Sequence, residues 1–320
     1  MDRLEAMSIV LAVAEGGSLS AAARQKRAPL ATVSRKVSEL EEHLQTKLFN
    51  RTSRALVPTD VGRSFIAATK RILAEVAEAE RTASGEYSTP RGELTVSAPI
   101  SLGRTHLLPV VAEFLATFPE VDVQLSFTDR AVNLLEEHVD VALRIGALGD
   151  SSLIAARIGE VRRVVCASPA YLKSRGSPRS PEDLSKHDCI TYAPTQSTSR
   201  WTFMQGETEY VVPVRSRLLV SNLESACDAA RAGIGITVLF SYIVGEMVKS
   251  GELTPLLQDF QPAPRPVSFV YSPNRFMPVK LRAFLDFAIP RLRHRLGDLP
   301  KALAPRKGLK AQSEPTTRAK

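Results

Sequence analysis

The sequence lacks the cysteine and histidine patterns of a disulfide-linked protein or a structural metal site. Its three cysteines, Cys166, Cys189 and Cys227, are odd in number and far apart, which argues against a disulfide framework. We expect each to pack as a small apolar residue in a reducing compartment. The five histidines show no ligand-pair spacing with one another or with cysteine. The sequence therefore predicts no metal site and no cofactor.

Long apolar runs are also missing. No segment approaches the ~18 consecutive apolar residues that a membrane span needs. The first residues, Met1-Asp2-Arg3-Leu4-Glu5, are not a cationic segment followed by a long apolar one. These absences predict a soluble, cytoplasmic protein with no membrane partner.

Motifs for catalysis are absent in the same way. The segment Gly16-Gly17-Ser18-Leu19-Ser20 lacks the last glycine of a nucleophile elbow. Gly233-Ile234-Gly235 follows a predicted helix rather than a strand, unlike a dinucleotide fingerprint. No paired-carboxylate motif stands out, although a Ser, His and acid set brought together only by the fold would be invisible in sequence. We predict no catalytic residues and do not expect an enzyme.

Charge is concentrated at the two ends of the chain. The formal net charge of +8 divides into +3 over residues 1–85, zero over residues 86–300 and +5 over residues 301–320. Within residues 24–54 there are eight Lys and Arg against three Glu. Such a local cationic excess is the electrostatic footprint of phosphate contact.

Residues 18–54 read as two short helices, a turn and a basic hairpin. Ser18 can cap the first helix, and Lys26-Arg27-Ala28-Pro29 ends it. The next helix has a buried stripe of Val33, Val37, Leu40 and Leu44, opposite the small polar and cationic residues Thr32, Ser34, Arg35, Lys36 and Ser38. A helix of this kind fits a DNA major groove. Alone, the pattern is also that of an ordinary amphipathic helix with a solvated face.

The segments Lys47–Arg51 and Ala55–Pro58 predict two strands around Thr52-Ser53-Arg54, a wing behind the helices. Five segments in order then resemble the winged helix-turn-helix of LysR-type transcriptional regulators. They are Gly17-Ser18-Leu19-Ser20-Ala21-Ala22-Ala23, Thr32-Val33-Ser34-Arg35-Lys36-Val37, Leu40-Glu41, Lys47-Leu48-Phe49-Asn50-Arg51 and Pro58-Thr59-Asp60-Val61-Gly62. The resemblance implies binding to double-stranded DNA through Ser18, Ser20, Leu30, Ala31, Thr32, Ser34, Arg35, Lys36, Arg51 and Arg54.

Two departures from the family pattern affect the turn. Lys26 and Arg27 stand where the family usually has an apolar residue and a glycine. Pro29-Leu30 stands where it usually has Ser-Pro, which removes a capping hydroxyl worth roughly 1 kcal/mol.

A long helix is predicted after Thr59, with a narrow apolar seam through Val61, Phe65, Ala68, Ile72, Val76 and Ala79. A single seam of this kind needs a partner helix. In LysR-type proteins the equivalent helix pairs across a dimer, which implies a homodimer or a dimer of dimers. The alternative is a helix packed on its own DNA-binding domain.

From residue 92 the pattern changes to alternating strands and helices. We predict strands at Leu94–Ala98, Val121–Phe127 and Val139–Ile145, with helices at Thr105–Phe118 and Ala131–His138 between them. After a second lobe, a strand at Pro266–Tyr271 and a helix at Val279–Leu292 return to the first. An interrupted lobe of this kind resembles the periplasmic-binding-protein fold, which the same regulators use as their sensing domain.

The predicted fold class is thus α/β, with an all-α-rich N-terminal winged helix-turn-helix, a long linker helix and a two-lobed periplasmic-binding-protein-like sensing domain. The predicted boundaries are 1–59 for the DNA-binding domain, 60–91 for the linker helix and hinge, 92–163 with 267–296 for lobe I, 164–266 for lobe II, and 297–320 for a disordered basic tail.

A small-molecule effector, expected to be an organic anion, would bind between the lobes past the carboxyl ends of the strands. The candidate residues at that rim are Ile100, Ser101, Thr128, Gly146 and Asn222. Ser101 and Asn222 are placed to cap helices, so a plain capping role is equally open. Arg144 either supplies charge there or forms a structural ion pair, and Trp201 is a core residue or a ligand contact. An architectural DNA-binding protein without a sensor is disfavoured, because it would not need this neutral two-lobed body.

Overall fold

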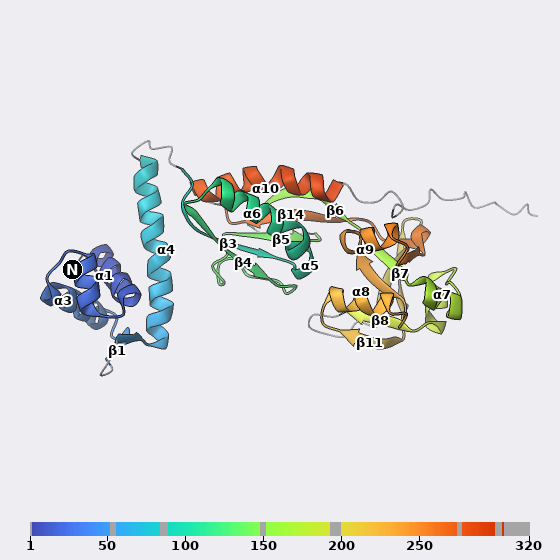
Figure 1. The fold of residues 1–320 in the computed structure, drawn as a ribbon, viewed down its shortest axis with the longest axis horizontal. Coiled ribbons are helices and arrows are strands. Elements are labelled where there is room, and N and C mark those ends of the chain that lie inside the picture. Colours follow the sequence, from blue (N-terminus) through green and yellow to red (C-terminus); the bar gives the residue numbers. More distant parts are fainter. Residues whose placement is uncertain are drawn as a thin grey trace, which may run out of the picture. The chain divides into compact units, whose positions relative to one another are not determined.

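The structure, a computed structural model, describes residues 2–51, 56–83, 89–147, 152–192, 200–273, 277–297 and 303 (Figure 1). Its Cα positions group into two units, Met1–Thr89 and Pro90–Lys320. Each unit is described by itself.

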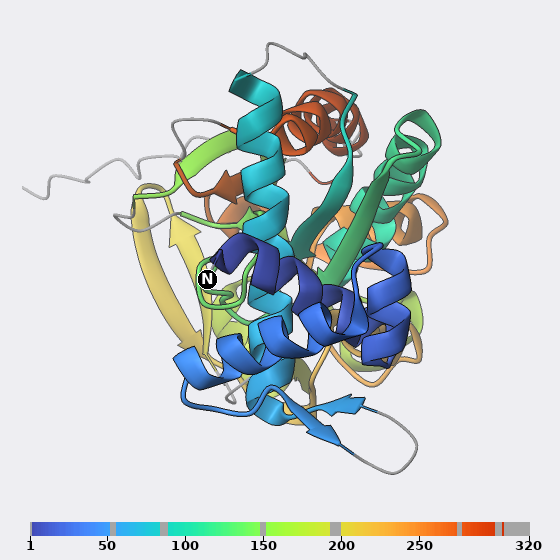
Figure 2. The same cartoon turned by 90° about the vertical axis from the view of Figure 1, so that its left-hand side faces the viewer.

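The first unit consists of helices and one two-stranded hairpin. Its elements are α1 (Arg3–Gly16), α2 (Leu19–Gln25), α3 (Leu30–His43), β1 (Phe49–Arg51), β2 (Leu56–Pro58) and α4 (Asp60–Ala83). Helices α1, α2 and α3 share one apolar core that includes Val10, Ala22, Val33, Val37 and Leu40. Figure 2 shows these helices in blue, packed around one another beside the long cyan helix α4.

Hydroxyl groups begin two of these helices, as the sequence predicts. Ser18 Oγ accepts a hydrogen bond from the Ala21 amide at 3.1 Å and so caps α2. Thr59 Oγ1 accepts one from the Gly62 amide at 2.9 Å at the start of α4. Each bond satisfies an amide of a first helical turn that has no partner within its helix.

A buried carboxylate joins α3 to the hairpin. Glu41 Oε1 accepts from the amides of Leu48 at 2.9 Å and Phe49 at 3.2 Å, and Lys47 Nζ lies 2.7 Å from Oε2. Burial raises the pKa of Glu41, but these donors outweigh burial and leave the pKa below its ordinary value. The charged form of Glu41 therefore stabilises the fold.

The hairpin is joined in turn to α4. The Thr59 amide donates to the Leu48 carbonyl at 2.9 Å. Gly62 lies so close to the same carbonyl that a Cβ there would be 2.0 Å from its oxygen. Only glycine fits at this position, which gives a physical reason for the last residue of the Pro58–Gly62 motif.

The second unit begins with a five-stranded sheet in the order β4-β3-β5-β14-β6. The strands are β3 (Gly92–Ala98), β4 (Val121–Phe127), β5 (Val141–Ile145), β6 (Ile154–Val161) and β14 (Arg265–Tyr271). Strand β3 is parallel to β4 and β5, whereas β14 is antiparallel to β5 and β6. This sheet forms the first lobe together with α5 (Ile100–Leu102), the π-helical turn η1 (Gly103–Leu107), α6 (Leu108–Thr117) and α10 (Val279–Gly297).

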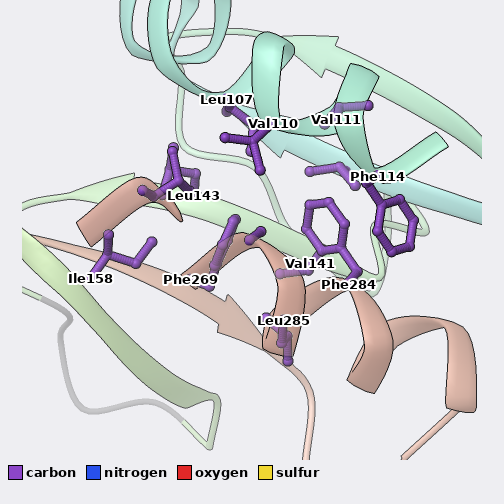
Figure 3. Close-up of a cluster of buried hydrophobic side chains, with 14 of the residues drawn as sticks. Leu107, Val110, Val111, Phe114, Val141, Leu143, Ile158, Phe269, Phe284 and Leu285 are labelled. Carbon is purple, nitrogen blue, oxygen red and sulfur yellow. The ribbon is translucent and has the colours of Figure 1, made fainter. Parts of the chain in front are cut away.

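Helices α6 and α10 cover one face of this sheet, and aromatic rings fill the space between (Figures 1 and 3). The Phe114 ring of α6 meets the Phe284 ring of α10 edge-on, with centroids 5.2 Å apart. Phe284 also lies 5.6 Å from the ring of Phe269 in β14. The first lobe thus depends on residues from both ends of the second unit.

The second lobe lies between β6 and β14 in the sequence. It has one three-stranded sheet, β12-β7-β13, and two strand pairs, β11 with β8 and β10 with β9. Its strands are β7 (Arg163–Ala167), β8 (Cys189–Tyr192), β9 (Arg200–Gln205), β10 (Thr208–Pro213), β11 (Ser216–Val220), β12 (Thr237–Phe240) and β13 (Thr254–Leu256). Its helices are α7 (Pro169–Arg175), η2 (Pro181–Lys186), α8 (Leu223–Arg231), α9 (Ser241–Lys249) and η3 (Gln258–Phe260).

Apolar side chains of the second lobe are buried as expected. Trp201 packs in the core beside Phe203 and Leu184, as the core interpretation predicts. All three cysteines are free and buried, and burial raises the pKa of Cys227 to about 11 and that of Cys189 to about 12. These thiols act as small apolar residues.

The predicted helix at Ala131–His138 is wrong. The segment forms turns, because the Asn133 side chain accepts from the Leu135 amide at 3.1 Å and so competes with helix formation. His138 then takes a positive φ of 55° and ends the segment.

Of residues 298–320 the structure describes Leu303 alone. This side chain is buried in the same core cluster as Leu223 and Val244. It therefore does not belong to a disordered tail, and the rest of the predicted tail lies outside the described residues.

Within the described ranges, no single helix has the length and apolar composition to cross a membrane. Only the bent pair α1 with α2 meets that test together, at an angle of 117°.

The Glu41 contacts predict a pH-dependent cost of neutralising this side chain. Glu41→Gln should lower the unfolding free energy by about 1 to 3 kcal/mol at pH 7, because buried amides lose a charged acceptor. The pKa of Glu41 is lower in the folded protein than in the unfolded chain. Its charged form therefore stabilises the fold at any pH above the unfolded-state pKa, and this stabilisation is lost as the pH falls through the folded-state pKa. The difference from wild type should therefore shrink below about pH 4.3.

Calorimetric unfolding of the full chain between pH 7 and pH 3.5 measures this difference. Glu42→Gln is the matched control, since Glu42 is the exposed neighbour of Glu41. Equal stability losses for the two variants, or a loss that does not vary with pH, would rule out the role given to Glu41.

Candidate functional site

Helix α3 separates an apolar face from an exposed one. Val33, Val37 and Leu40 are buried against the other helices, as their spacing predicts. Leu30, Ala31 and Arg35 are exposed, and the Arg35 side chain keeps 67% of its surface accessible beside Glu39, 3.7 Å away. Thr32 and Ser34 are half-buried on the flanks of this face.

Lys36 differs from its neighbours on α3. Its Nζ lies 2.6 Å from Glu5 Oε2 of α1, and only 15% of its side chain is exposed. The ammonium group is therefore part of an ion pair between two helices. The exposed face expected from the sequence loses one of its two cations.

The turn before α3 shows both departures from the family pattern. Arg27 has a positive φ of 50°, a conformation that glycine adopts without strain. Helix α3 begins after Pro29 with no side-chain cap, as the missing hydroxyl predicts. At the other end of α2, Ser20 is exposed and Ser18 is half-buried at the cap.

The two predicted strands of the hairpin are present and antiparallel, with Phe49 opposite Pro58 and Arg51 opposite Leu56. For Arg51 the structure describes the backbone but not the side chain, and Arg54 falls in the undescribed residues 52–55. Their predicted DNA contacts therefore lie outside what the structure describes.

A pocket of about 330 Å³ lies between the two lobes of the second unit. Strand ends of the first lobe contribute most of its wall, and Tyr192, Leu223, Phe240 and Tyr242 of the second lobe close the opposite side. The Phe240 and Tyr242 rings stack with centroids 5.6 Å apart. A pocket with this apolar wall and a few charged groups suits a small organic molecule.

The five residues predicted at this rim are not equally placed. Thr128 lines the pocket, whereas Ile100, Ser101, Gly146 and Asn222 do not line it. Asn222 caps α8, with Oδ1 accepting from the Ser225 amide at 2.7 Å. The Gly146 amide donates to the Pro266 carbonyl at 2.9 Å, beside the pocket-lining Ile145 and Arg265.

Ser101 does not cap a helix. The residue at the cap position of α5 is Pro99, which has no side-chain cap bond, and Ser101 lies inside the turn. Its hydroxyl donates to Glu224 Oε1 of α8 at 2.7 Å. The hydroxyl expected to bind an effector anion is thus bonded to an anion of the chain itself.

A second carboxylate, that of Asp129, also links the two lobes beside the pocket. Asp129 accepts from the Ile100 amide at 3.1 Å and from the Tyr192 hydroxyl at 2.6 Å. Burial and the bond to Asp129 both raise the pKa of Tyr192, so the phenol stays protonated and donates. Two acids therefore hold groups of the first lobe to groups of the second.

Two cations of the pocket wall, Arg130 and Arg265, are exposed, and a third, Arg144, is half-buried. Among the described residues this wall contains Arg130, Arg144 and Arg265 but one acid, Asp129. Arg130 is neutralised by Glu137, whose pKa it lowers, and Arg144 donates to the Val132 carbonyl. The excess of guanidinium groups favours an anionic ligand.

Sequence reasoning missed the residues that form this wall from the second lobe. Tyr192 lies at the end of β8, far in the chain from Phe240 and Tyr242 at the junction of β12 and α9, and no motif relates the two places. Two acids could have been identified from the sequence. Asp129 directly follows the predicted contact Thr128, and Glu224 lies two residues after the predicted cap Asn222. Among the described residues no group of His, Cys, Asp and Glu could hold a metal ion.

Comparison with known proteins gives two family matches. Residues 4–63 match the model described as "Bacterial regulatory helix-turn-helix protein, lysR family", and residues 88–293 match "LysR substrate binding domain". Together these matches cover most of both units.

Relatives of known name match over nearly the whole chain. The transcriptional regulator CrgA of Neisseria meningitidis serogroup B is 34% identical over 295 residues, covering 91% of this chain and 98% of CrgA. The transcriptional activator AaeR of Escherichia coli is 32% identical over 289 residues, covering 89% and 93%. The full-length structure of the Vibrio cholerae virulence activator AphB has a TM-score of 0.58 at 30% identity, covering 90% of this chain and 98% of AphB. These relatives are transcriptional regulators rather than enzymes.

The different surroundings of Arg35 and Lys36 predict different effects of their removal. Arg35→Ala should weaken binding to a selected duplex by about 1 to 3 kcal/mol and affect random duplexes less, if its guanidinium contacts bases. Lys36→Ala should instead lower the stability of the first unit, because it leaves Glu5 without its partner.

Fluorescence anisotropy with duplexes selected from a random pool measures affinity, and thermal unfolding measures stability. Ser38→Ala, an exposed change on the same helix, serves as the control. An Arg35→Ala protein that keeps its preference for the selected duplex would show that this side chain does not read bases.

Proposed function

Because the chain belongs to the LysR family of bacterial helix-turn-helix transcriptional regulators, we propose that it reads DNA through the exposed face of α3 and responds to a small organic anion bound between its lobes. The observation that carries the DNA assignment is the division of α3 into a buried Val33, Val37 and Leu40 stripe and an exposed Leu30, Ala31 and Arg35 face. A major groove accepts one such face. Since chromosomal DNA is its target, the site of action is the cytoplasm.

The exposed face of α3 combines one cation with apolar groups. Arg35 can form paired hydrogen bonds to a guanine edge, whereas Leu30 and Ala31 can contact only apolar parts of a base. Leu30 keeps 49% of its surface exposed at the start of the helix. In the major groove the thymine methyl is the apolar group available, so we expect thymine opposite Leu30.

The proposed effector position is the 330 Å³ pocket, with Thr128 at its rim. The guanidinium groups of Arg144 and Arg265 supply positive charge, and the rings of Phe240 and Tyr242 supply apolar surface. A ligand touching both lobes would favour one lobe arrangement through its differential contacts.

The seam on α4 is proposed as the contact between two copies of the chain. Ile72 and Val61 are exposed on this helix, and Phe65, Ala68 and Val76 are half-buried. Phe65 packs partly against the core of its own unit. The exposed apolar part of the seam, around Val61 and Ile72, would be buried by pairing with an equivalent helix.

Replacement of thymine by uracil tests the reading of DNA. Selection of duplexes from a random pool by the full chain should give a site whose affinity falls about fourfold when uracil replaces the contacted thymine, which loses one methyl contact of about 0.8 kcal/mol. A Leu30→Ser protein should bind the two duplexes with equal affinity. If no sequence is enriched, the proposed function fails. If uracil has no effect at any position, Leu30 contacts no thymine methyl.

A charge placed in the α4 seam tests the oligomer. Ile72→Glu should dissociate it, because pairing would bury a carboxylate among apolar side chains with no counter-ion. Sedimentation velocity measures the outcome, and Glu75→Gln, an exposed polar change on the same helix, is the control. An unchanged sedimentation coefficient for Ile72→Glu would remove the seam from the contact between copies.

A further inference from the structure

Glu224 reaches across the mouth of the cleft from the first turn of α8. Its Oε1 accepts the Ser101 hydroxyl at 2.7 Å and lies 3.8 Å from Arg104 Nη2. Glu224 belongs to the second lobe, whereas Ser101 and Arg104 belong to the α5–η1 segment of the first. One carboxylate therefore links the two lobes through a hydroxyl donor and a guanidinium.

These two donors are the groups that proteins use to bind a free carboxylate. A hydroxyl supplies one charge-assisted hydrogen bond, and a guanidinium supplies charge and further N–H groups. Neither donor lines the pocket, but Pro99, two residues before Ser101, and Leu223, next to Glu224, do line it. A ligand in the pocket therefore lies beside these segments of both lobes.

A ligand carboxylate and Glu224 cannot share these donors. Two carboxylates at one pair of donors repel, and the energy of ionising both rises sharply. The Glu224 side chain can turn away from Ser101 and Arg104 without disturbing the backbone. It is 29% exposed, and the cap of α8 is Asn222 rather than Glu224. The second acid at the mouth, Asp129, is fixed by two donors of its own and does not compete.

Ser101 is already expected at the effector site from its position after the first strand. We propose that Glu224 is an internal ligand of Ser101 and Arg104, which the effector carboxylate displaces. This inference rests on the proposed function, in which the cleft binds a small organic anion. Glu224 makes the cleft selective: a carboxylate alone binds weakly, because it must displace Glu224. A ligand that also fills the pocket beside Phe240 and Tyr242 gains enough contact to do so.

Benzoate is a suitable probe, since it combines a carboxylate with an aromatic ring, and benzamide is its neutral counterpart. Isothermal titration of the full chain with each compound gives the affinities. Glu224→Gln removes the competing charge and keeps the side-chain shape, so benzoate should bind at least about tenfold more tightly than to wild type. Benzamide affinity should change less than twofold, because no charge is relieved.

Two further variants separate displacement of Glu224 from a general loosening of the cleft. Asp228→Asn neutralises an exposed acid on the same helix, paired with Arg231, and should leave benzoate affinity unchanged. Adding Ser101→Ala to Glu224→Gln should abolish the gain, since the hydroxyl donor is lost. If Glu224→Gln does not fold, Arg104→Ala in the wild-type chain, at an exposed side chain, should weaken benzoate but not benzamide.

The outcomes are distinct from those that test the proposed function. Equal benzoate affinity for wild type and Glu224→Gln, an equal gain for benzamide, or no benzoate binding by either protein would each overturn the displacement of Glu224. Binding of the selected duplex by all these proteins would meanwhile leave the proposed function standing. Loss of sequence-selective duplex binding by wild type would refute the proposed function without reference to Glu224.

Discussion

Strand β14 is the constraint on which the second unit depends. It lies between β5 and β6 in the sheet but comes from the far side of the second lobe in the sequence. The first lobe cannot close its sheet, or bury Phe269 against Phe284 of α10, until the chain has passed through the second lobe and returned. Because β6 leads out and β14 leads back, the two lobes are joined side by side at one edge. The pocket between the lobes is lined in part by Arg265, at the start of the returning strand β14.

Much of the fold was predictable because local chemistry decides it. Ser18 and Thr59 cap helices through their own hydroxyls, and the Val33, Val37 and Leu40 stripe is buried because its spacing matches one helix face. Ala131–His138 failed for a local reason as well, since Asn133 forms a turn where apolar spacing alone indicates a helix. Trp201 followed the general tendency of a large ring to be buried.

The site was less predictable because its contacts join distant segments. The ion pair of Lys36 with Glu5 and the bond of Ser101 to Glu224 join residues that no short pattern relates. Position at a strand end did locate the mouth of the cleft, and Thr128 lies there. It did not indicate that the donors at that mouth are already occupied. Whether a polar group is free or satisfied depends on tertiary contacts, which periodicity and capping rules do not contain.

The two carboxylates at the mouth give the cleft an uneven charge. Asp129 and Glu224 are half-buried and hold donors of both lobes, while Arg130 and Arg265 of the pocket wall are exposed. A ligand therefore meets basic groups as well as acidic ones. This arrangement favours a molecule with one negative group. That group can lie at a guanidinium, while the uncharged part lies beside the carboxylate of Asp129.

The close approach of Gly62 to the Leu48 carbonyl also has a consequence for how DNA sites are spaced. Glu41 fixes the segment around Leu48 to α3, and Thr59 with Gly62 fixes the same segment to the start of α4. Helix α3 and the start of α4 are therefore both bonded to the same hairpin segment. In the proposed pairing through the α4 seam, this connection sets the separation of the two α3 helices. The spacing of two half-sites on DNA would then follow from the geometry of the pairing.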